Sequence, residues 1–515
     1  MGEGLIRRGI RIANIALGAK KLSSIQDADQ KAIAQRALAN QFADARGTVM
    51  KVGQLLASAD ADNNFQQLVK GIDALPLDII APHIEASLGQ PLDQVFESID
   101  ESIAAASLGQ VHHAILLNGH EVAVKIQYPD IADKVHSEIK LIGLMPGVGP
   151  VKKWGFDLES YKKSFKANMD LELDYETEAQ TQLNYRNLIQ VDGLIIPKVY
   201  SQFTRPNLLI QSWESGNYLD AINDWSNENR KKCAELILGT LFKSLFEVGI
   251  VHGDPHIGNS YFRLDQHQEP EMVLMDFGCT INISEKQRLS LLKLILSTVD
   301  QTDTSPLRYF TALGFDADKL SNIGDSLPMI SKLLFTPFIE TGTFIINHWD
   351  LEKNFNELLG DRRWWFRSAG PSQLFLIMRA FQGAMQQLSI LKTNVSWSQL
   401  LYKHVSQETL DNARLLNLPE LQQEKKLSAN SIKALASSLK VNVKENGLQK
   451  VNISLPVEMA LQLESIMPED VLALLHKTPE IDLNAINQKI RLSGIAPQKI
   501  FDLKNGTKEY SVWLE

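Results

Sequence analysis

The segment H-G-D-P-H-I-G-N (252–259), followed by M-V-L-M-D-F-G (272–278), decides the fold. It places Asp254, Asn259 and Asp276 in two loops that are separated by a strand, a polar turn and a second strand. Carboxylate and amide oxygens are the ligands that hard divalent cations prefer. A polar loop rich in turn residues would explain the glycines, but not an acid and an amide at this spacing. The two loops therefore predict a metal site.

A strand lysine precedes these loops. Lys125 lies in the segment VAVKIQ (122–127). The segment VHHAILL (111–117), Asn118-Gly119 and His120-Glu121 precede it. Asn-Gly between β-rich flanks predicts a hairpin with a two-residue turn of positive φ. Alone, Lys125 would be read as an edge lysine. A strand lysine, H-x-D-x-x-x-x-N and D-F-G in this order predict a protein-kinase-like fold. Lys125 would then hold the phosphates of ATP, Asp254 would orient the attacking group, and Asn259 and Asp276 would bind Mg²⁺.

The glycine-rich phosphate loop of ordinary kinases is missing before the hairpin. Its place is taken by Ala104, Ala105, Ala106 and Ser107, followed by Leu-Gly-Gln. Alanine disfavours the left-handed backbone conformations that glycine adopts freely, and its methyl group limits close approach to a phosphate. The sequence thus predicts that these four residues contact the nucleotide differently from a glycine-rich loop.

The departures from ordinary kinases have a pattern of their own. K-V-G-Q (51–54), the alanine-rich loop, VAVKIQYP (122–129), E-L-D-Y (172–175), HGDPHIGN and DFG together resemble the AarF/UbiB family of atypical kinases, over roughly residues 40 to 290. The resemblance implies a two-lobed kinase-like fold, Mg-dependent nucleotide binding, and ATPase rather than protein kinase activity. It also implies a role in ubiquinone or related isoprenoid-quinone lipid biosynthesis on a membrane surface.

The resemblance implies roles for four residues that match the motifs of the family. Lys51 and Gln54 would belong to an N-terminal helix that covers the active site, and being three apart they share a helix face. Glu172 and Asp174 match the family's E-x-D motif, which resembles a partner for the Lys51 region. All four are therefore assigned to the nucleotide site.

Helix geometry separates the acids of this region. We expect one long helix from about residue 158 to 190, in which Glu172 and Asp174 would point about 200° apart. Asp174 and Glu178 are four apart and share a face, so Glu178 is predicted to hold Lys125 and Glu172 to act near a helix end or bend. For each single acid, a solvated helix face is the alternative.

Two positions depart from the family pattern, and so does the end of the chain. Ile257 replaces the usual proline of HGDPHPGN, and Thr181 replaces the asparagine of E-A-x-N. Neither change removes a catalytic group. Many relatives end in transmembrane helices, whereas this chain ends in a soluble-looking appendage, so membrane attachment is expected to be peripheral.

The fold class that follows is α+β. We expect a two-lobed protein-kinase-like fold with an N-terminal helical extension (1–75), an N-lobe (76–216), a helical C-lobe (217–417) and a small C-terminal α/β appendage (418–515). The apolar run 371–391, interrupted by Arg379, is expected to be a buried helix.

Charge and composition limit the partners. The net charge of −9 argues against broad nucleic-acid binding. Residues 4–22 contain five basic residues and no acid, which suits a helix lying on anionic lipid, or else a solvated basic helix. No signal peptide or transmembrane segment is recognised, so a cytoplasmic protein, peripheral on the inner face of a membrane, is expected.

Three functions stay open at this point. The first is a Mg-dependent ATPase or small-molecule phosphotransferase that acts with quinone-biosynthesis proteins. The second is a non-catalytic nucleotide-binding scaffold or lipid-binding pseudokinase. The third is a serine/threonine protein kinase, which the alanine-rich loop, the K-x-G-Q helix and the missing A-P-E motif argue against.

Overall fold

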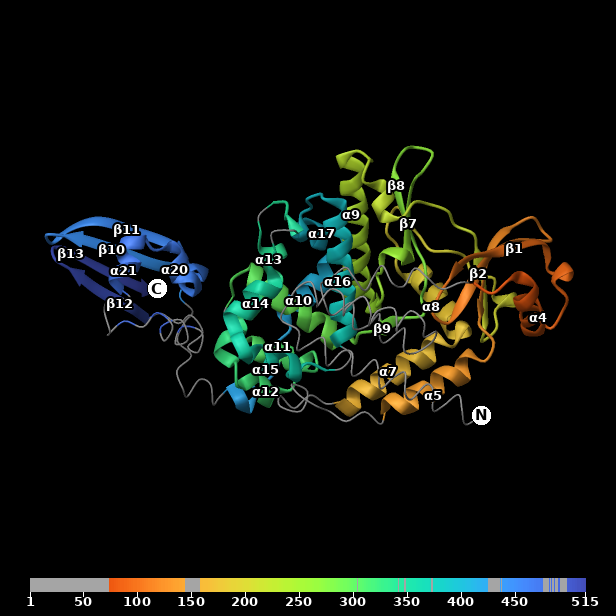
Figure 1. Cartoon of the computed structure of the whole chain (residues 1–515), viewed down its shortest axis with the longest axis horizontal. Helices are drawn as coiled ribbons and strands as arrows, with labels where there is room; N and C mark the ends of the chain where they lie inside the picture. Colours follow the sequence, from red (N-terminus) through yellow and green to blue (C-terminus); the bar gives the residue numbers. More distant parts are fainter. Residues whose placement is uncertain are drawn as a thin grey trace. The chain divides into compact units, whose positions relative to one another are not determined.

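The computed structural model describes residues 74–143, 158–424 except 303, 341, 347–348 and 372–373, residues 438–475 and 498–515, and residues 436, 481, 483, 486 and 490. The described chain divides into two compact units (Figure 1). Residues 74–143, 158–282 and 374–393 belong to the first unit, and the remaining residues to the second. Lys51, Gln54 and the basic segment 4–22 lie outside the described residues.

The first unit begins with an antiparallel sheet in the order β1-β2-β3-β5. Its strands are β1 (Phe96–Ala105), β2 (Gly109–Leu116), β3 (Glu121–Gln127) and β5 (Leu208–Ser212). Helix α4 (Leu77–Leu88) packs Ile80 and Ile84 on one face of the sheet, together with Val124 of β3. Successive strand residues point to opposite faces, so burial of Val124 directs Lys125 to the other face.

The hairpin in this sheet differs in detail from its prediction. Strand β1 precedes the hairpin and begins at Phe96, and most of its side chains are exposed. The β2–β3 turn has three residues, because Gly119 donates to the carbonyl of Leu116 (2.8 Å) and Leu116 to that of His120 (2.9 Å). Within this turn only Gly119 has a positive φ, 80°, which is a type I turn followed by a glycine bulge.

The long helix predicted from 158 to 190 is also interrupted. Helix α7 (Leu158–Glu172) ends before Leu173, and α8 (Tyr175–Leu188) begins after Asp174. Asp174 has an extended backbone, and its carboxylate accepts from the backbone N–H groups of Glu176 and Thr177, which caps α8. The residue that matches the family motif thus starts a new helix. Helix α5 (Ile131–Gly143) precedes both.

The rest of the first unit surrounds the two motif loops. Strands β6 (Ile250–His252) and β9 (Thr280–Asn282) pair antiparallel, and a second sheet has the order β4-β8-β7. The remaining elements are β4 (Leu194–Ile195), β7 (Ser260–Leu264), β8 (Pro270–Leu274), α9 (Asn227–Phe242), a π-helical turn (Lys243–Val248) and α16 (Leu374–Leu391). Residues 374–391 form α16, so the predicted helix is present over this range. The predicted burial is only partial, because Met378 is 47% exposed.

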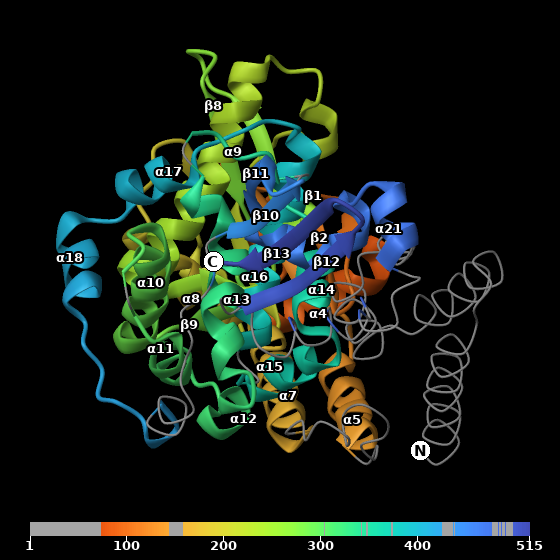
Figure 2. The same cartoon turned by 90° about the vertical axis from the view of Figure 1, so that its left-hand side faces the viewer.

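The second unit contains short helices and a four-stranded sheet (Figure 2). Its α-helices between residues 283 and 424 are α10 (Glu285–Val299), α11 (Pro306–Ala312), α12 (Ala317–Ser321), α13 (Leu327–Ile339), α14 (Leu351–Leu359), α15 (Arg363–Ala369), α17 (Trp397–His404) and α18 (Gln407–Leu415). The antiparallel sheet has the order β11-β10-β13-β12 and contains β10 (Ser438–Glu445), β11 (Leu448–Pro456), β12 (Gln498–Asn505) and β13 (Lys508–Leu514). Within the ranges described here, no helix combines the length and apolarity that crossing a bilayer requires.

Candidate functional site

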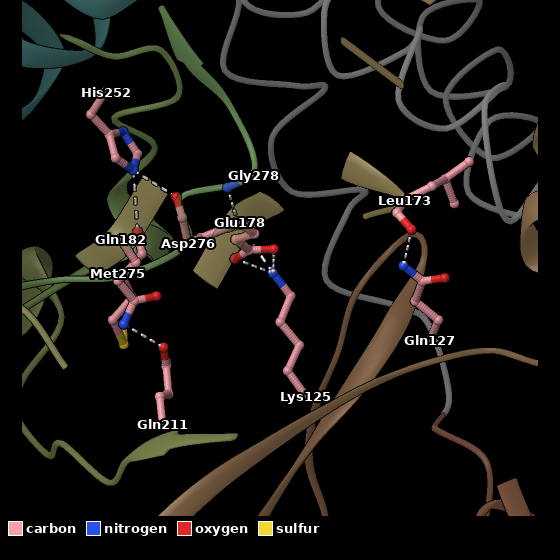
Figure 3. A network of polar contacts seen from close by, with 10 residues as sticks. All are labelled: Lys125, Gln127, Leu173, Glu178, Gln182, Gln211, His252, Met275, Asp276 and Gly278. Carbon is pink, nitrogen blue, oxygen red and sulfur yellow. Dashed lines mark hydrogen bonds and ion pairs between the residues drawn. The ribbon is translucent and has the colours of Figure 1, made fainter. Parts of the chain in front are cut away.

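Lys125 is the centre of an ionic cluster with Glu178, which is buried, and Asp276, which is 44% exposed (Figure 3). Its Nζ donates to both carboxylate oxygens of Glu178, at 2.8 and 2.9 Å, and lies 3.3 Å from Oδ1 of Asp276. The ammonium group also lies 4.7 Å from the centre of the Tyr175 ring, close enough for a cation–π interaction. The lysine of β3, the first turn of α8 and the D-F-G loop therefore meet at one point.

The ion pair predicted between Lys125 and Glu178 is thus present in the structure. Asp174 caps α8, which places Glu178 one turn into the helix, on the side that faces β3. The Glu178 side chain is 2% exposed, and a buried carboxylate is stable only when it is paired. Lys125 supplies that pairing.

Acids outnumber bases in this cluster. Burial raises the pKa of Glu178 to about 7; the Lys125 charge lowers it, whereas Asp276 and Glu172 raise it. Burial alone would lower the pKa of Lys125, but Asp276 and Glu178 outweigh that effect and raise it well above its ordinary value. Burial is thus the main cause of the Glu178 shift, whereas the neighbouring acids cause that of Lys125. The excess of acids over bases in this cluster fits a divalent cation.

Asp276 is held in a backbone conformation that few side chains adopt. Its φ is 60°, in the left-handed region where aspartate is tolerated better than most residues. Its Oδ1 accepts from the N–H of Gly278 (3.3 Å), and its own carbonyl accepts from Nε2 of His252 (2.7 Å). The carboxylate of Asp276 is therefore oriented from both sides of the loop.

Phe277 anchors the same loop in the core. It is 1% exposed and packs against Tyr185 of α8 (ring centroids 5.1 Å apart) and edge-to-face against His252 (5.5 Å). Helix α8 thus carries both Glu178, which pairs with Lys125, and Tyr185, which packs on Phe277. The lysine and the D-F-G loop are positioned by one helix.

Asn259 is attached to both motif loops. Its Nδ2 donates to the backbone carbonyl of Asp254 (3.0 Å), and its carbonyl accepts from the N–H of Met275 (2.9 Å), the residue before Asp276. With the amide nitrogen used as donor, Oδ1 is the atom suited to a cation. Asn259 and Asp276 are oxygen donors on adjacent loops, and Mg²⁺ is usually bound by one or two carboxylates plus substrate phosphates and water. The residues present therefore fit Mg²⁺.

The E-x-D motif is divided between two roles. Asp174 is engaged as the helix cap, and its Oδ2 accepts from the Thr177 hydroxyl (2.7 Å). Glu172, the last residue of α7, reaches the cluster: its Cγ lies 3.7 Å from where a Cβ on Gly278 would be. Glu172 therefore lies at a helix end, as predicted, and its role at the nucleotide site stays a prediction.

The alanine-rich loop is a tight connection between β1 and β2. Ala104 and Ala105 end β1, Ala106 donates to the carbonyl of Gly109 (2.8 Å), and Ser107 is buried. A Cβ on Gly109 would collide with the backbone of Ile126 in β3, so this glycine permits close approach of β2 to β3 rather than of the loop to a phosphate.

Arg379 was not among the site residues predicted from the sequence. Its Nη2 donates to Oδ1 of Asp254 at 2.7 Å, and both side chains are at most 15% exposed. A signal was available, because an arginine inside an apolar helix is buried only with an acidic partner. That partner could not be identified from local spacing, since Arg379 lies 125 residues from Asp254.

The chain is similar in sequence to known atypical kinases. Residues 67–308 match the ABC1 atypical kinase-like domain. The chain is 27% identical over 399 residues to the probable serine/threonine-protein kinase abkA of Dictyostelium discoideum, covering 71% of this chain and 69% of that protein. It is 30% identical over 250 residues to the mitochondrial atypical kinase COQ8B of Danio rerio, covering 47% of this chain and only 40% of that protein.

A solved structure is similar as well. Rv3197 of Mycobacterium tuberculosis, determined as a complex with erythromycin, is 24% identical, has a TM-score of 0.48, and is matched over 69% of this chain and 91% of that one. The mixed helices and sheets of the structure and the match of residues 67–308 to a kinase-like domain confirm the α+β, protein-kinase-like fold class predicted from the sequence. Residues 67–308 thus carry the ABC1 atypical kinase-like domain, which confirms the resemblance to the AarF/UbiB family that the motifs predict.

Proposed function

We propose that this protein is a Mg-dependent, ATP-binding atypical kinase or ATPase that supports ubiquinone or related isoprenoid-quinone lipid biosynthesis at a membrane surface. The observation that carries the proposal is the contact of Lys125 with the buried carboxylate of Glu178, at 2.8 Å, and with Asp276, at 3.3 Å. Phosphoryl transfer needs a positioned lysine, an acid that holds it and oxygen ligands for a cation. The described residues supply these groups.

Each residue has a separate task in this proposal. Lys125, held by Glu178, would contact the phosphates as a point charge. Asn259 Oδ1 and the Asp276 carboxylate would hold Mg²⁺, which when bound neutralises charge on the β- and γ-phosphates. Asp254 would orient the attacking hydroxyl or water. Charge stabilisation and positioning, rather than covalent chemistry by the protein, would lower the barrier.

The quinone-lipid part of the proposal rests on the family. The matched relatives include a mitochondrial atypical kinase and a probable serine/threonine kinase. Membrane binding rests on the basic segment 4–22, which lies outside the described residues. ATP and ADP, anionic lipid and quinone-biosynthesis proteins are the partners that we propose.

The test is Mg-dependent ADP release by the purified protein. We expect turnover without any protein substrate, and higher turnover with vesicles that contain phosphatidylglycerol than with phosphatidylcholine vesicles. Metal-dependent nucleotide binding without turnover would instead identify a nucleotide-binding scaffold. If ATP neither binds nor turns over, the proposed function is wrong. Phosphate transfer to a generic protein substrate would favour the serine/threonine kinase alternative.

The alanine-rich loop provides a specific prediction about affinity. Ala105→Gly or Ala106→Gly is expected to tighten ATP binding by roughly 2- to 5-fold, because glycine relaxes a backbone constraint worth about 0.5–1 kcal/mol and removes a methyl group that limits close approach. Equilibrium titration with a fluorescent ATP analogue measures the change. Ala106→Ser, which keeps the constraint, is the matched control. Equal ATP affinities in the wild type and in all three variants would show that this loop does not control nucleotide binding.

A further inference from the structure

The catalytic-loop acid of this protein has a partner outside the motif loops. Arg379, on α16, donates through Nη2 to Oδ1 of Asp254 at 2.7 Å. The Arg379 side chain is 10% exposed and that of Asp254 is 15% exposed. Charge-assisted hydrogen bonds of this length are roughly twice as strong as neutral ones, and removing one partner of a buried pair is costly. The contact therefore restricts the Asp254 carboxylate.

Two more residues of α16 touch the same loop. Gly383 lies so close to Pro255 that a Cβ at this position would be 2.8 Å from the Pro255 carbonyl oxygen and would overlap its ring. Gln387 donates through Nε2 to that carbonyl at 2.9 Å. Arg379, Gly383 and Gln387 are spaced four residues apart, so they form one stripe along the helix. The loop is thus held through a side chain and through its backbone.

We propose that this stripe of α16 is a positioning device for the catalytic loop, and that Arg379 is a positioning residue that sets the orientation of Asp254. The inference rests on the proposed function, in which Asp254 orients the attacking group, and it assigns a role to a helix outside the family motifs. Arg379 acts through Asp254 and does not hold nucleotide. Its removal should therefore slow turnover without weakening ATP binding.

The direction of the effect follows from geometry. A carboxylate that orients a nucleophile must be held in one rotamer, and a displacement of about 1 Å at a reacting centre costs roughly 100-fold in rate. Arg379→Met removes the charged donor while keeping much of the apolar volume. Gly383→Ala displaces the loop through contact with Pro255 and changes no charge. Both variants disturb the same loop by independent means.

The experiment measures kcat and KM for Mg-dependent ADP release in the full chain. We expect Arg379→Met and Gly383→Ala each to lower kcat by about 10- to 100-fold with KM for ATP unchanged. Arg379→Lys, which keeps one charged donor but not the planar fork, should regain part of that loss. Met378→Ala on the exposed side of α16 is the matched control and should retain wild-type turnover.

Hydrogen exchange tests the loop without using activity. The backbone N–H groups of Gly253 and Asn259 donate to Cys279 and His256, and both should exchange faster in Arg379→Met and Gly383→Ala than in Met378→Ala. If the wild type is active and both variants keep its kcat and its rate of loop exchange, the positioning role of α16 is wrong, while the proposed function stands. A higher kcat in Arg379→Met would also overturn it, since the contact would then be inhibitory. Inactive wild type with faster loop exchange in both variants would reject the proposed function and retain the positioning role.

Discussion

Asp276→Asn is expected to reduce Mg-dependent ADP release by roughly 1,000-fold or more, the largest loss of activity that we foresee. Stabilisation of transition-state charge by a bound cation is worth several kcal/mol, and each 1.36 kcal/mol is about tenfold in rate. The amide keeps the shape of the carboxylate but loses its charge. It also weakens the contact with Lys125 Nζ, now 3.3 Å. Turnover is measured across a magnesium titration.

Two controls separate metal binding from folding in this variant. Asp192→Asn, an exposed acid after α8, should retain wild-type turnover. High magnesium should restore part of the activity of Asp276→Asn if the lost interaction is with the cation. Wild-type turnover in Asp276→Asn would show that this residue is not a metal ligand, and the assignment of the D-F-G loop would have to be abandoned.

Lys125→Met is expected to have the largest effect on stability, a loss of about 3 kcal/mol, because it leaves a buried carboxylate without its cation. Glu178 is 2% exposed and both of its oxygens accept from Lys125. ATP binding should fall as well, since the phosphates lose a charged contact. Urea unfolding followed by tryptophan fluorescence measures the stability, and nucleotide titration measures the binding.

The double variant Lys125→Met/Glu178→Gln shows whether the lost stability comes from the unpaired charge of Glu178 or from the changed shape of the side chain at position 125. Glutamine removes the buried charge, so we expect most of the lost stability to return while ATP binding stays weak. If the double variant is as unstable as Lys125→Met alone, the unpaired charge of Glu178 is not the cause of the loss.

The pH dependence of this destabilisation has a definite sign. Burial raises the folded-state pKa of Glu178 to about 7, above its ordinary 4.5, and loss of Lys125 raises it further. Stability from such a group is fully present below the unfolded pKa and is lost as pH rises through the folded pKa. Lys125→Met should therefore be close to wild type below about pH 5 and least stable above about pH 8. A pH-independent difference would contradict this account.

Much of the site could be read from the chain because its chemistry is local. The H-x-D-x-x-x-x-N and D-F-G segments place Asp254, Asn259 and Asp276 in short loops, and their residue types and spacing are those that the proposed Mg-nucleotide site requires. The strand assignment of Lys125 follows from the β-rich segments on both sides of Asn118-Gly119, and Val124 and Ile126 are indeed buried in the sheet core. Glu178 followed from helical spacing, even though the helix itself was predicted too long.

Turn and helix boundaries were less predictable because several backbone conformations suit the same residues. Asn118-Gly119 suggested a two-residue turn, but the structure has a three-residue turn with positive φ at the glycine alone. Asn446-Gly447, with φ of 50° and 77°, does make a two-residue turn between β10 and β11, and that signal was overlooked. Asp174 ended a predicted helix because its side chain competes for backbone N–H groups, as capping aspartates do.

The sequence by itself determined which groups this protein brings to its site: a strand lysine, a helix glutamate, and an acid, an amide and a D-F-G acid at fixed spacing. Only the tertiary structure decided what holds these groups in place. Arg379 reaches Asp254 across 125 residues of chain, and Gly383 is needed because of a backbone carbonyl at Pro255. The physical reason is that periodicity and turn chemistry act over a few residues, whereas the pairing of a buried charge depends on which helix packs beside it.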